Sequence, residues 1–374
     1  MDSPRARPGE FQWEATLWHE LTHVITLQMS NQRLPRWLSE GISTYEEKKA
    51  RPEWARQQDI QFVSLLDRGE AIKLTDLNAA FTSPKLISIA YYQASLVVEH
   101  IVAAYGDAGL RKFIRSFAQG LDNEAAMKAT LNTDFAQMQD GFDKTLDKLF
   151  ADIRGVVNPP KDVDLLKMEV EELRALAAAN PRSYPVRIVL GTRLRKAGKL
   201  DDAVQEFETA AKLLPIATGP ESPHAQMAEI AVERKDPAKA IAELEALVAV
   251  DFDNVEAPRK LVTLLRQEKI EDPAKLRPIY ERIAAIDPFD AEAHAALGRL
   301  AMQRNEPDVA SREFRAVIAL APVDRAAAQT DLAESYFKSG KKVEAKKHTL
   351  AALEIAPSYE RAQDLLLKLT GSPQ

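Results

Sequence analysis

The sequence predicts a mainly all-α protein built from two helical parts. In the first part, apolar residues recur at helical spacing between Gly and Asn turns, and no segment alternates clearly as a strand would. In the second part, breaks in the helical pattern recur every 34 to 37 residues from Pro181 to Pro357. The two parts are a helical domain at 11–155 and a helical-repeat superhelix at 162–374, joined by a linker at 156–161.

The chain opens with residues 1–10, which are polar and rich in proline and arginine, so we expect them to be disordered. The next segment is apolar on nearly every side of a helix, which predicts a buried helix. Its apolar residues are Phe11, Trp13, Leu17, Trp18, Leu21, Val24, Ile25 and Leu27.

This first helix carries the pattern H-E-x-x-H at residues 19–23. Positions four apart lie on one helix face, so His19 and His23 can present two imidazoles to one zinc ion. Glu20 lies roughly 100° further round the same turn, close enough to act on a water at the metal. The pattern is typical of zinc-dependent peptidases. The alternative is a chance motif on a solvated helix face.

A second predicted helix offers a further carboxylate. A catalytic zinc site takes three protein ligands and keeps the fourth place for water, so two histidines leave it one ligand short. Pro35 suits the first turn of a helix, and Trp37, Leu38, Ile42 and Tyr45 follow at helical spacing. Glu40 lies in this helix and is the candidate third ligand.

The H-E-x-x-H helix followed by W-L-x-E-G-x-x-x-Y at residues 37–45 resembles the gluzincin metallopeptidases, relatives of thermolysin and the zinc aminopeptidases. The resemblance implies that Glu40 is the third zinc ligand. Thr44 stands where thermolysin-like enzymes carry an aspartate that orients a ligand histidine, so the residue with that role is not identified. Glu46 or Glu47 could replace it, but we expect both to be exposed.

The segment Ala90–Ile101 is similar to the helix of the same enzymes in which a tyrosine hydroxyl faces the zinc. The resemblance implies that Tyr91, with Tyr92 as the reserve, stabilises the oxyanion formed when water attacks the carbonyl. The alternative is that both rings pack in a helix core. His100, nine residues further on, is expected to be a structural histidine rather than a ligand.

The resemblance to this peptidase MA-like family covers roughly residues 10–152. Members of the family carry a small β-sheet subdomain before the H-E-x-x-H helix, and only 18 residues precede His19 here. We therefore expect the N-terminal part of the peptidase domain to be missing, because the chain is a fragment or begins too far downstream. No compartment is assigned. If an upstream signal peptide was lost, we expect the periplasm or cell envelope; if there was none, we expect the cytoplasm.

The second part has the period of tetratricopeptide repeats, and five units are recognisable. Small residues recur where the two helices of a unit must approach closely; they are Gly191, Gly298, Ala333, Ala203, Ala240, Ala310 and Ala345, with Phe207, Phe314 and Leu353 at similar late positions. The stretch 162–180 is expected to form one helix. Such repeats stack into a solenoid whose concave surface we expect to bind a protein partner.

Composition narrows the choice of function. A net charge of −6 over 374 residues makes nucleic acid or anionic membrane an unexpected partner, and no membrane span is expected in this chain. The sequence has no cysteine, which excludes disulfides and thiolate zinc sites. His224, His294 and His348 lie in separate repeats without metal-ligand spacing.

Together these features predict a zinc metallopeptidase with one zinc ion per chain, acting on a peptide or protein substrate. Zinc would be held by His19, His23 and Glu40, with Glu20 as general base and Tyr91 at the oxyanion. The repeats would recruit a protein partner. The alternatives are a non-catalytic or truncated peptidase-like scaffold, and a protease regulated by its own solenoid or N-terminus.

Overall fold

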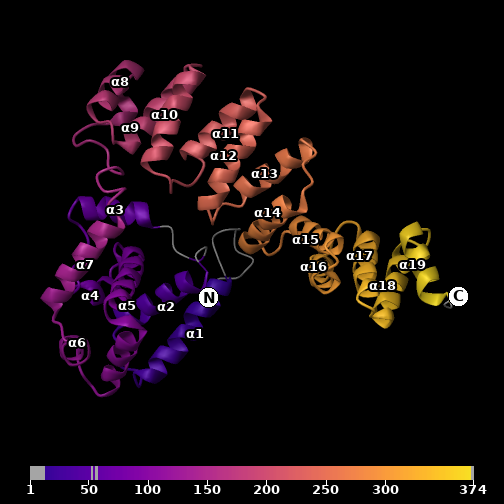
Figure 1. Cartoon of the computed structure of the whole chain (residues 1–374), viewed down its shortest axis with the longest axis horizontal. Helices are drawn as coiled ribbons and strands as arrows, with labels where there is room; N and C mark the ends of the chain where they lie inside the picture. Colours follow the sequence, from indigo (N-terminus) through magenta and orange to yellow (C-terminus); the bar gives the residue numbers. More distant parts are fainter. Residues whose placement is uncertain (1–12, 52–53, 55–57, 372–374) are drawn as a thin grey trace. The chain divides into compact units, whose positions relative to one another are not determined.

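The computed structural model describes residues 13–51, 54 and 58–371, so the disorder predicted for residues 1–10 and the position of Phe11 lie outside the described residues. The chain divides into two compact units, Gln12–Arg234 and a unit containing Lys235–Gln374. The prediction of an all-α fold is confirmed, because the described residues form helices and turns and include no strand (Figure 1).

The first unit begins with seven helices. Asp122 and Asp134 cap α6 and α7 through their side chains, as short acidic residues do at helix starts. Gly106 has φ 70° inside α5 and breaks it into two segments, in agreement with the predicted Gly turn. The helices are α1 (Trp13–Met29), α2 (Arg36–Ala50), α3 (Asp59–Asp67), α4 (Leu77–Ala80), α5 (Ile87–Ala118), α6 (Asn123–Leu131) and α7 (Phe135–Leu149).

Helix α5 is the centre of this lobe. Its apolar residues are buried with Phe62, Phe81 and Phe142 in one cluster. Among the described residues α5 alone has the length and composition to cross a bilayer, but half of its apolar stretch is buried in the protein. Helix α2 packs closely on α5 at Gly41, where a Cβ would lie 2.8 Å from the carbonyl oxygen of Ala94. This close approach of α2 to α5 fixes the position of Glu40, the residue before Gly41.

The helical repeats follow. Residues 162–180, expected to form one helix, instead form a 3₁₀ turn, η2 (Leu165–Lys167), and a shorter helix, because the side chain of Asp164 caps the turn and Glu169 with Glu172 starts the next helix. The helices are α8 (Val170–Ala179), α9 (Tyr184–Lys196), α10 (Leu200–Leu213), α11 (Pro223–Glu233), α12 (Pro237–Val250), α13 (Glu256–Gln267), α14 (Pro273–Ile286), α15 (Ala291–Gln303), α16 (Pro307–Ala319), α17 (Arg325–Lys338), α18 (Lys342–Ile355) and α19 (Glu360–Thr370).

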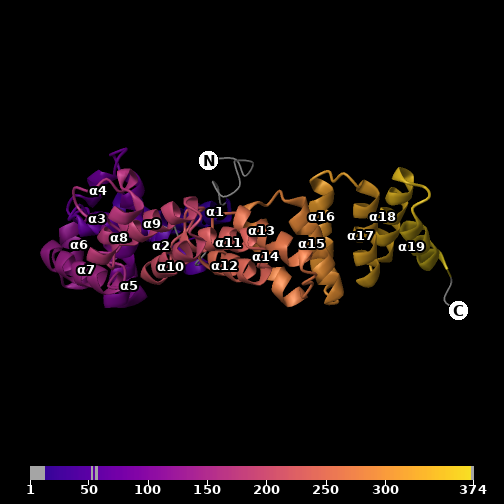
Figure 2. The ribbon, with the colours of Figure 1, turned by 90° about the horizontal axis from the view of Figure 1, so that it is seen from above.

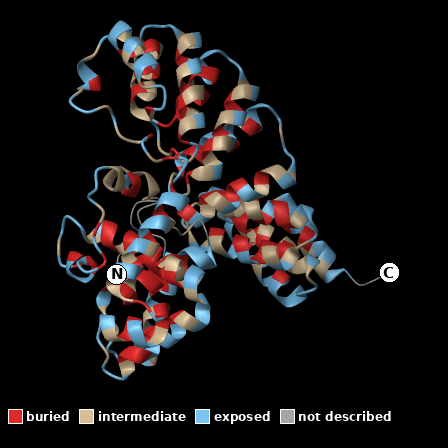
Figure 3. Ribbon diagram, turned by 60° about the vertical axis from the view of Figure 1, so that its left-hand side comes forward, coloured by how far each residue is buried: buried red, intermediate tan, exposed pale blue. Residues whose placement is uncertain are grey.

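Two of the small residues predicted at close helix crossings, Gly191 and Gly298, occupy such crossings. A Cβ on Gly191 would lie 2.7 Å from the ring of Phe207, and one on Gly298 would lie 2.4 Å from the ring of Phe314. Both rings are buried. Helices α15, α16, α17 and α18 lie side by side in chain order (Figure 2). In Figure 3 the buried residues lie mainly where helices pack against one another, and the exposed residues lie on the outside.

The first repeat shares its core with the lobe inside the unit Gln12–Arg234. Leu214 and Ala217, between α10 and α11, belong to the same buried cluster as Phe62 and the other lobe aromatics. The backbone N–H of Tyr184 donates to the carbonyl oxygen of Val156 at 3.1 Å, and Val156 is itself buried. The start of the segment predicted as a linker is therefore packed against the lobe.

Candidate metal centre

Helix α1 turns its polar side inward. Its buried residues are Ala15, His19, Thr22 and Thr26, and both threonine hydroxyls donate to carbonyl oxygens one turn earlier. The prediction of a buried, all-round apolar helix is wrong, because polar partners on α2 draw the His19 side of α1 inward and leave its apolar side outside. The exposed apolar residues of α1 are Trp13, Leu17, Trp18, Leu21, Val24 and Ile25.

The structure brings His19, His23 and Glu40 together. One potential ligand atom from each lies within 4.8 Å of the others. Glu40 Oε2 is 3.3 Å from His19 Nε2 and 3.4 Å from His23 Nε2. A tetrahedral zinc ion with ligand atoms at 2.0–2.1 Å separates neighbouring ligands by about 3.3 Å. The donor set and its spacing therefore fit zinc.

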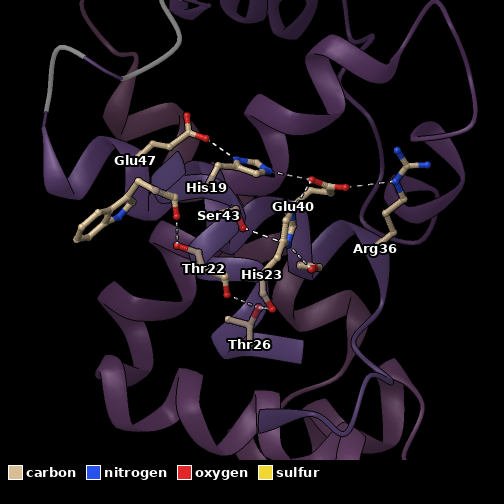
Figure 4. Close-up of polar contacts among 10 residues, drawn as sticks. His19, Thr22, His23, Thr26, Arg36, Glu40, Ser43 and Glu47 are labelled. Carbon is tan, nitrogen blue, oxygen red and sulfur yellow. Dashed lines mark hydrogen bonds and ion pairs between the residues drawn. The ribbon is translucent and has the colours of Figure 1, made fainter. Parts of the chain in front are cut away.

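The other nitrogen of each imidazole is held by a side chain of α2. His19 Nδ1 bonds a carboxylate oxygen of Glu47, and His23 Nδ1 lies 3.2 Å from Ser43 Oγ (Figure 4). His23 Nδ1 also lies 2.9 Å from Ser39 Oγ. Such contacts fix the ring orientation and leave Nε2 available for a metal. Both imidazoles present Nε2 to the same side, toward Glu40.

The expectation that Glu47 is exposed is wrong: it is only 5% exposed. Glu47 lies seven residues after Glu40, which is two helical turns and therefore the same face of α2. Thr44, one turn after Glu40, is buried and its hydroxyl has no hydrogen-bond partner. The carboxylate that contacts His19 thus comes from one turn further along the helix than the position occupied by Thr44.

Electrostatics at the site follow from these contacts. Burial alone would lower the pKa of His19, but hydrogen bonds with Glu40 and Glu47 outweigh it and raise that pKa to about 9. Burial would raise the pKa of Glu40, yet hydrogen bonds from His19 and His23 hold it well below its usual range. Glu40 is therefore a charged ligand, and a metal ion must displace a proton from His19 to bind.

The two candidate tyrosines have different surroundings. The Tyr91 ring lies 6.3 Å from the His19 ring and 5.0 Å from the Phe81 ring, and Tyr91 is only partly buried. The Tyr92 hydroxyl donates to Asp59, and Tyr92 is buried in the lobe core. Burial, with Asp59 beside it, raises the pKa of Tyr92 above its usual value. Of these two tyrosines, Tyr91 is the one that lies beside the three candidate ligands.

Glu20 lies on the exposed side of α1, next in sequence to His19. The site residues that sequence reasoning did not identify are all on α2: Ser39, Ser43 and Arg36, whose Nε is 3.5 Å from Glu40 Oε1. Glu47 was named as a candidate to orient a ligand histidine but was expected to be exposed. The signal was present in the sequence. Arg36, Glu40, Ser43 and Glu47 follow one another at intervals of four, three and four, which makes a polar stripe on one helix face.

Comparison with known families agrees with this arrangement. Residues 6–148 match the Peptidase MA superfamily, and residues 188–254 and 295–360 match the tetratricopeptide repeat. The chain thus combines a Peptidase MA superfamily domain with tetratricopeptide repeats, as the resemblance implied. In coarse terms it is a peptidase-like tetratricopeptide repeat protein.

Several solved structures similar to this chain are tetratricopeptide repeat proteins. YrrB, a TPR protein with an unusual peptide-binding site, is 19% identical, with a TM-score of 0.34, over 52% of this chain and 98% of that chain. A thermophilic TPR protein from Thermus thermophilus is 23% identical, with a TM-score of 0.27, over 50% of this chain and 98% of that chain. No curated protein matches the chain.

Proposed function

We propose that the lobe is a zinc-dependent metallopeptidase that hydrolyses peptide bonds of a peptide or protein substrate. The observation that carries the proposal is the meeting of His19 Nε2, His23 Nε2 and Glu40 Oε2 at distances that suit one zinc ion, with Glu20 one residue from a ligand. When bound, zinc supplies Lewis-acid activation of the scissile carbonyl and of the attacking water.

The protein's own residues would share the remaining work. Glu47 and Ser39 orient the two imidazoles through their Nδ1 atoms. Glu20 would accept the proton of the attacking water and pass it to the leaving amine. Tyr91 would donate a hydrogen bond to the oxyanion that develops on the substrate carbonyl. The tetratricopeptide repeats would bind a protein partner on their concave surface and raise its local concentration.

The first test is the zinc content of the purified full chain beside the double variant His19→Ala/His23→Ala. We expect about one zinc ion per wild-type chain and its loss in the double variant. In a peptide-hydrolysis assay, Glu20→Gln should keep zinc and lower kcat by about 10²- to 10⁴-fold.

Two results would count against the proposal in different ways. A folded wild-type chain without zinc would remove the metal site. Full zinc occupancy with no peptide hydrolysis by either wild type or Glu20→Gln would instead favour the non-catalytic scaffold, in which the peptidase-like lobe only binds its partner.

A further inference from the structure

The two oxygens of Glu40 have different partners. Oε2 faces both histidines, at 3.3 Å and 3.4 Å from their Nε2 atoms. Oε1 points the other way, toward Arg36 Nε at 3.5 Å (Figure 4). Arg36 is the first residue of α2 and precedes Glu40 by one helical turn, so the contact is set by helix geometry.

Arg36 is itself held in place by an aromatic residue. The centre of its guanidinium lies 5.5 Å from the centroid of the Phe81 ring. Phe81 is buried and packs edge-on against Tyr91, with ring centroids 5.0 Å apart. The guanidinium therefore rests on an anchored ring while its edge remains near Glu40, although its side chain is 48% exposed.

We propose that Arg36 is a positioning residue for the metal centre: it holds Oε1 of Glu40 away from the metal, so that Glu40 binds through Oε2 alone. The terminal torsion of a glutamate is broad, so a carboxylate without a second partner can rotate and offer both oxygens to a metal. A planar guanidinium restrains such rotation better than a flexible ammonium. The inference rests on the proposed zinc site.

Arg51 is a matched control at the other end of α2. Its side chain is 49% exposed, it pairs with Glu14 at 3.0 Å, and its guanidinium lies 5.0 Å from the Trp54 ring. Arg51 thus has the same charge, exposure and type of aromatic contact as Arg36. It differs in the carboxylate it contacts, because Glu14 is not one of the three candidate ligands.

The experiment compares wild type, Arg36→Gln, Arg36→Lys and Arg51→Gln as full chains, with folding checked by circular dichroism. Zinc affinity is measured by competition with a chromophoric chelator, and coordination by the visible spectrum of the Co²⁺-loaded protein. We expect Arg36→Gln to bind zinc about 10-fold more weakly and to shift the Co²⁺ spectrum toward five-coordination. Arg36→Lys should fall in between, and Arg51→Gln should match wild type.

Equal zinc affinity and equal Co²⁺ spectra for Arg36→Gln and Arg51→Gln would overturn the inference while leaving the zinc site intact. Tighter zinc binding by Arg36→Gln would also overturn it, because charge repulsion would then outweigh any orienting effect. Failure of both wild type and Arg51→Gln to bind metal would remove the proposed function and this inference together. If Arg36→Gln does not fold, Arg36→Lys decides by the same two readouts.

Discussion

Helices α1 and α16 differ in the large side chains that they bury, although α16 also buries Ser311 and Glu313. Helix α16 places Ala310, Phe314 and Val317 in a core shared with its neighbours. Helix α1 buries His19, Thr22 and Thr26, and exposes Leu17 and other large apolar residues. The hydrophobic effect therefore orients α16, whereas specific hydrogen bonds between α1 and α2 orient the buried face of α1. A metal site needs the second arrangement, since its ligands must converge and be held at fixed angles.

The largest effect on stability is expected where apolar packing orients the helix. Phe314→Ala should reduce the free energy of unfolding by about 3–5 kcal/mol, because it removes a buried ring that fills the space left by Gly298. Chemical denaturation of the full chain, followed by circular dichroism, measures the change. A loss below about 1 kcal/mol would mean that the α15–α16 crossing does not depend on this ring.

The polar contacts of α1 can be broken without removing apolar packing. Glu47→Gln should weaken zinc binding by about 10- to 100-fold, because the buried carboxylate that orients His19 becomes a neutral amide. Chelator competition gives the affinity. The control is Glu46→Gln, which changes a neighbouring carboxylate that accepts a hydrogen bond from Lys49. Equal affinities for the two variants would show that Glu47 does not orient His19.

A partly buried polar pair in the solenoid, His294 and Glu313, extends the comparison to the effect of pH. His294 Nδ1 lies 2.8 Å from Glu313 Oε2, and this hydrogen bond raises the pKa of His294, with Asp290 adding a smaller effect in the same direction. A raised folded-state pKa stabilises the protein below the unfolded value of about 6.5, and this stabilisation is lost as pH rises through the folded value. The Tm difference between wild type and His294→Gln should therefore be larger at pH 6 than at pH 9.

His348, in the same unit, has a pKa shifted in the opposite direction, so its variant should show the opposite dependence of Tm on pH. Burial, with Lys347 nearby, lowers its pKa, so the wild-type side chain resists protonation and its contribution is lost as pH falls below about 6.5. His348→Gln should therefore gain in Tm relative to wild type on acidification. The same pH dependence for the two variants would show that global charge, rather than these local contacts, governs the response.

The smallest effect is expected on the exposed side of α1. Leu17→Ser should change the free energy of unfolding by no more than about 0.5 kcal/mol, because Leu17 is 62% exposed. Thermal unfolding beside Phe314→Ala gives the contrast directly. A loss of several kcal/mol would mean that the apolar side of α1 is covered in solution.

The same contrast explains what the sequence could predict. The repeats follow from a fixed period and from glycines that face rings, as at Gly298 and Phe314, so local pattern and packing agree. The two histidines and Glu40 followed from spacing and resemblance. The orientation of α1 could not be predicted from apolar periodicity, because polar contacts with α2 set it. The burial of Glu47 was missed, although its seven-residue spacing from Glu40 placed both on one face.

The shared core of the lobe and the first repeat has a practical consequence for dissecting the protein. Cutting the chain at Val156, where the proline-rich segment suggests a domain border, would expose the lobe surface that Leu214 and Ala217 cover. The separated lobe would expose apolar surface. The separated solenoid would lose the packing of Tyr184 against the lobe core. The first repeat therefore completes the core of the lobe, and a truncation that removes it should yield insoluble material rather than a soluble isolated lobe.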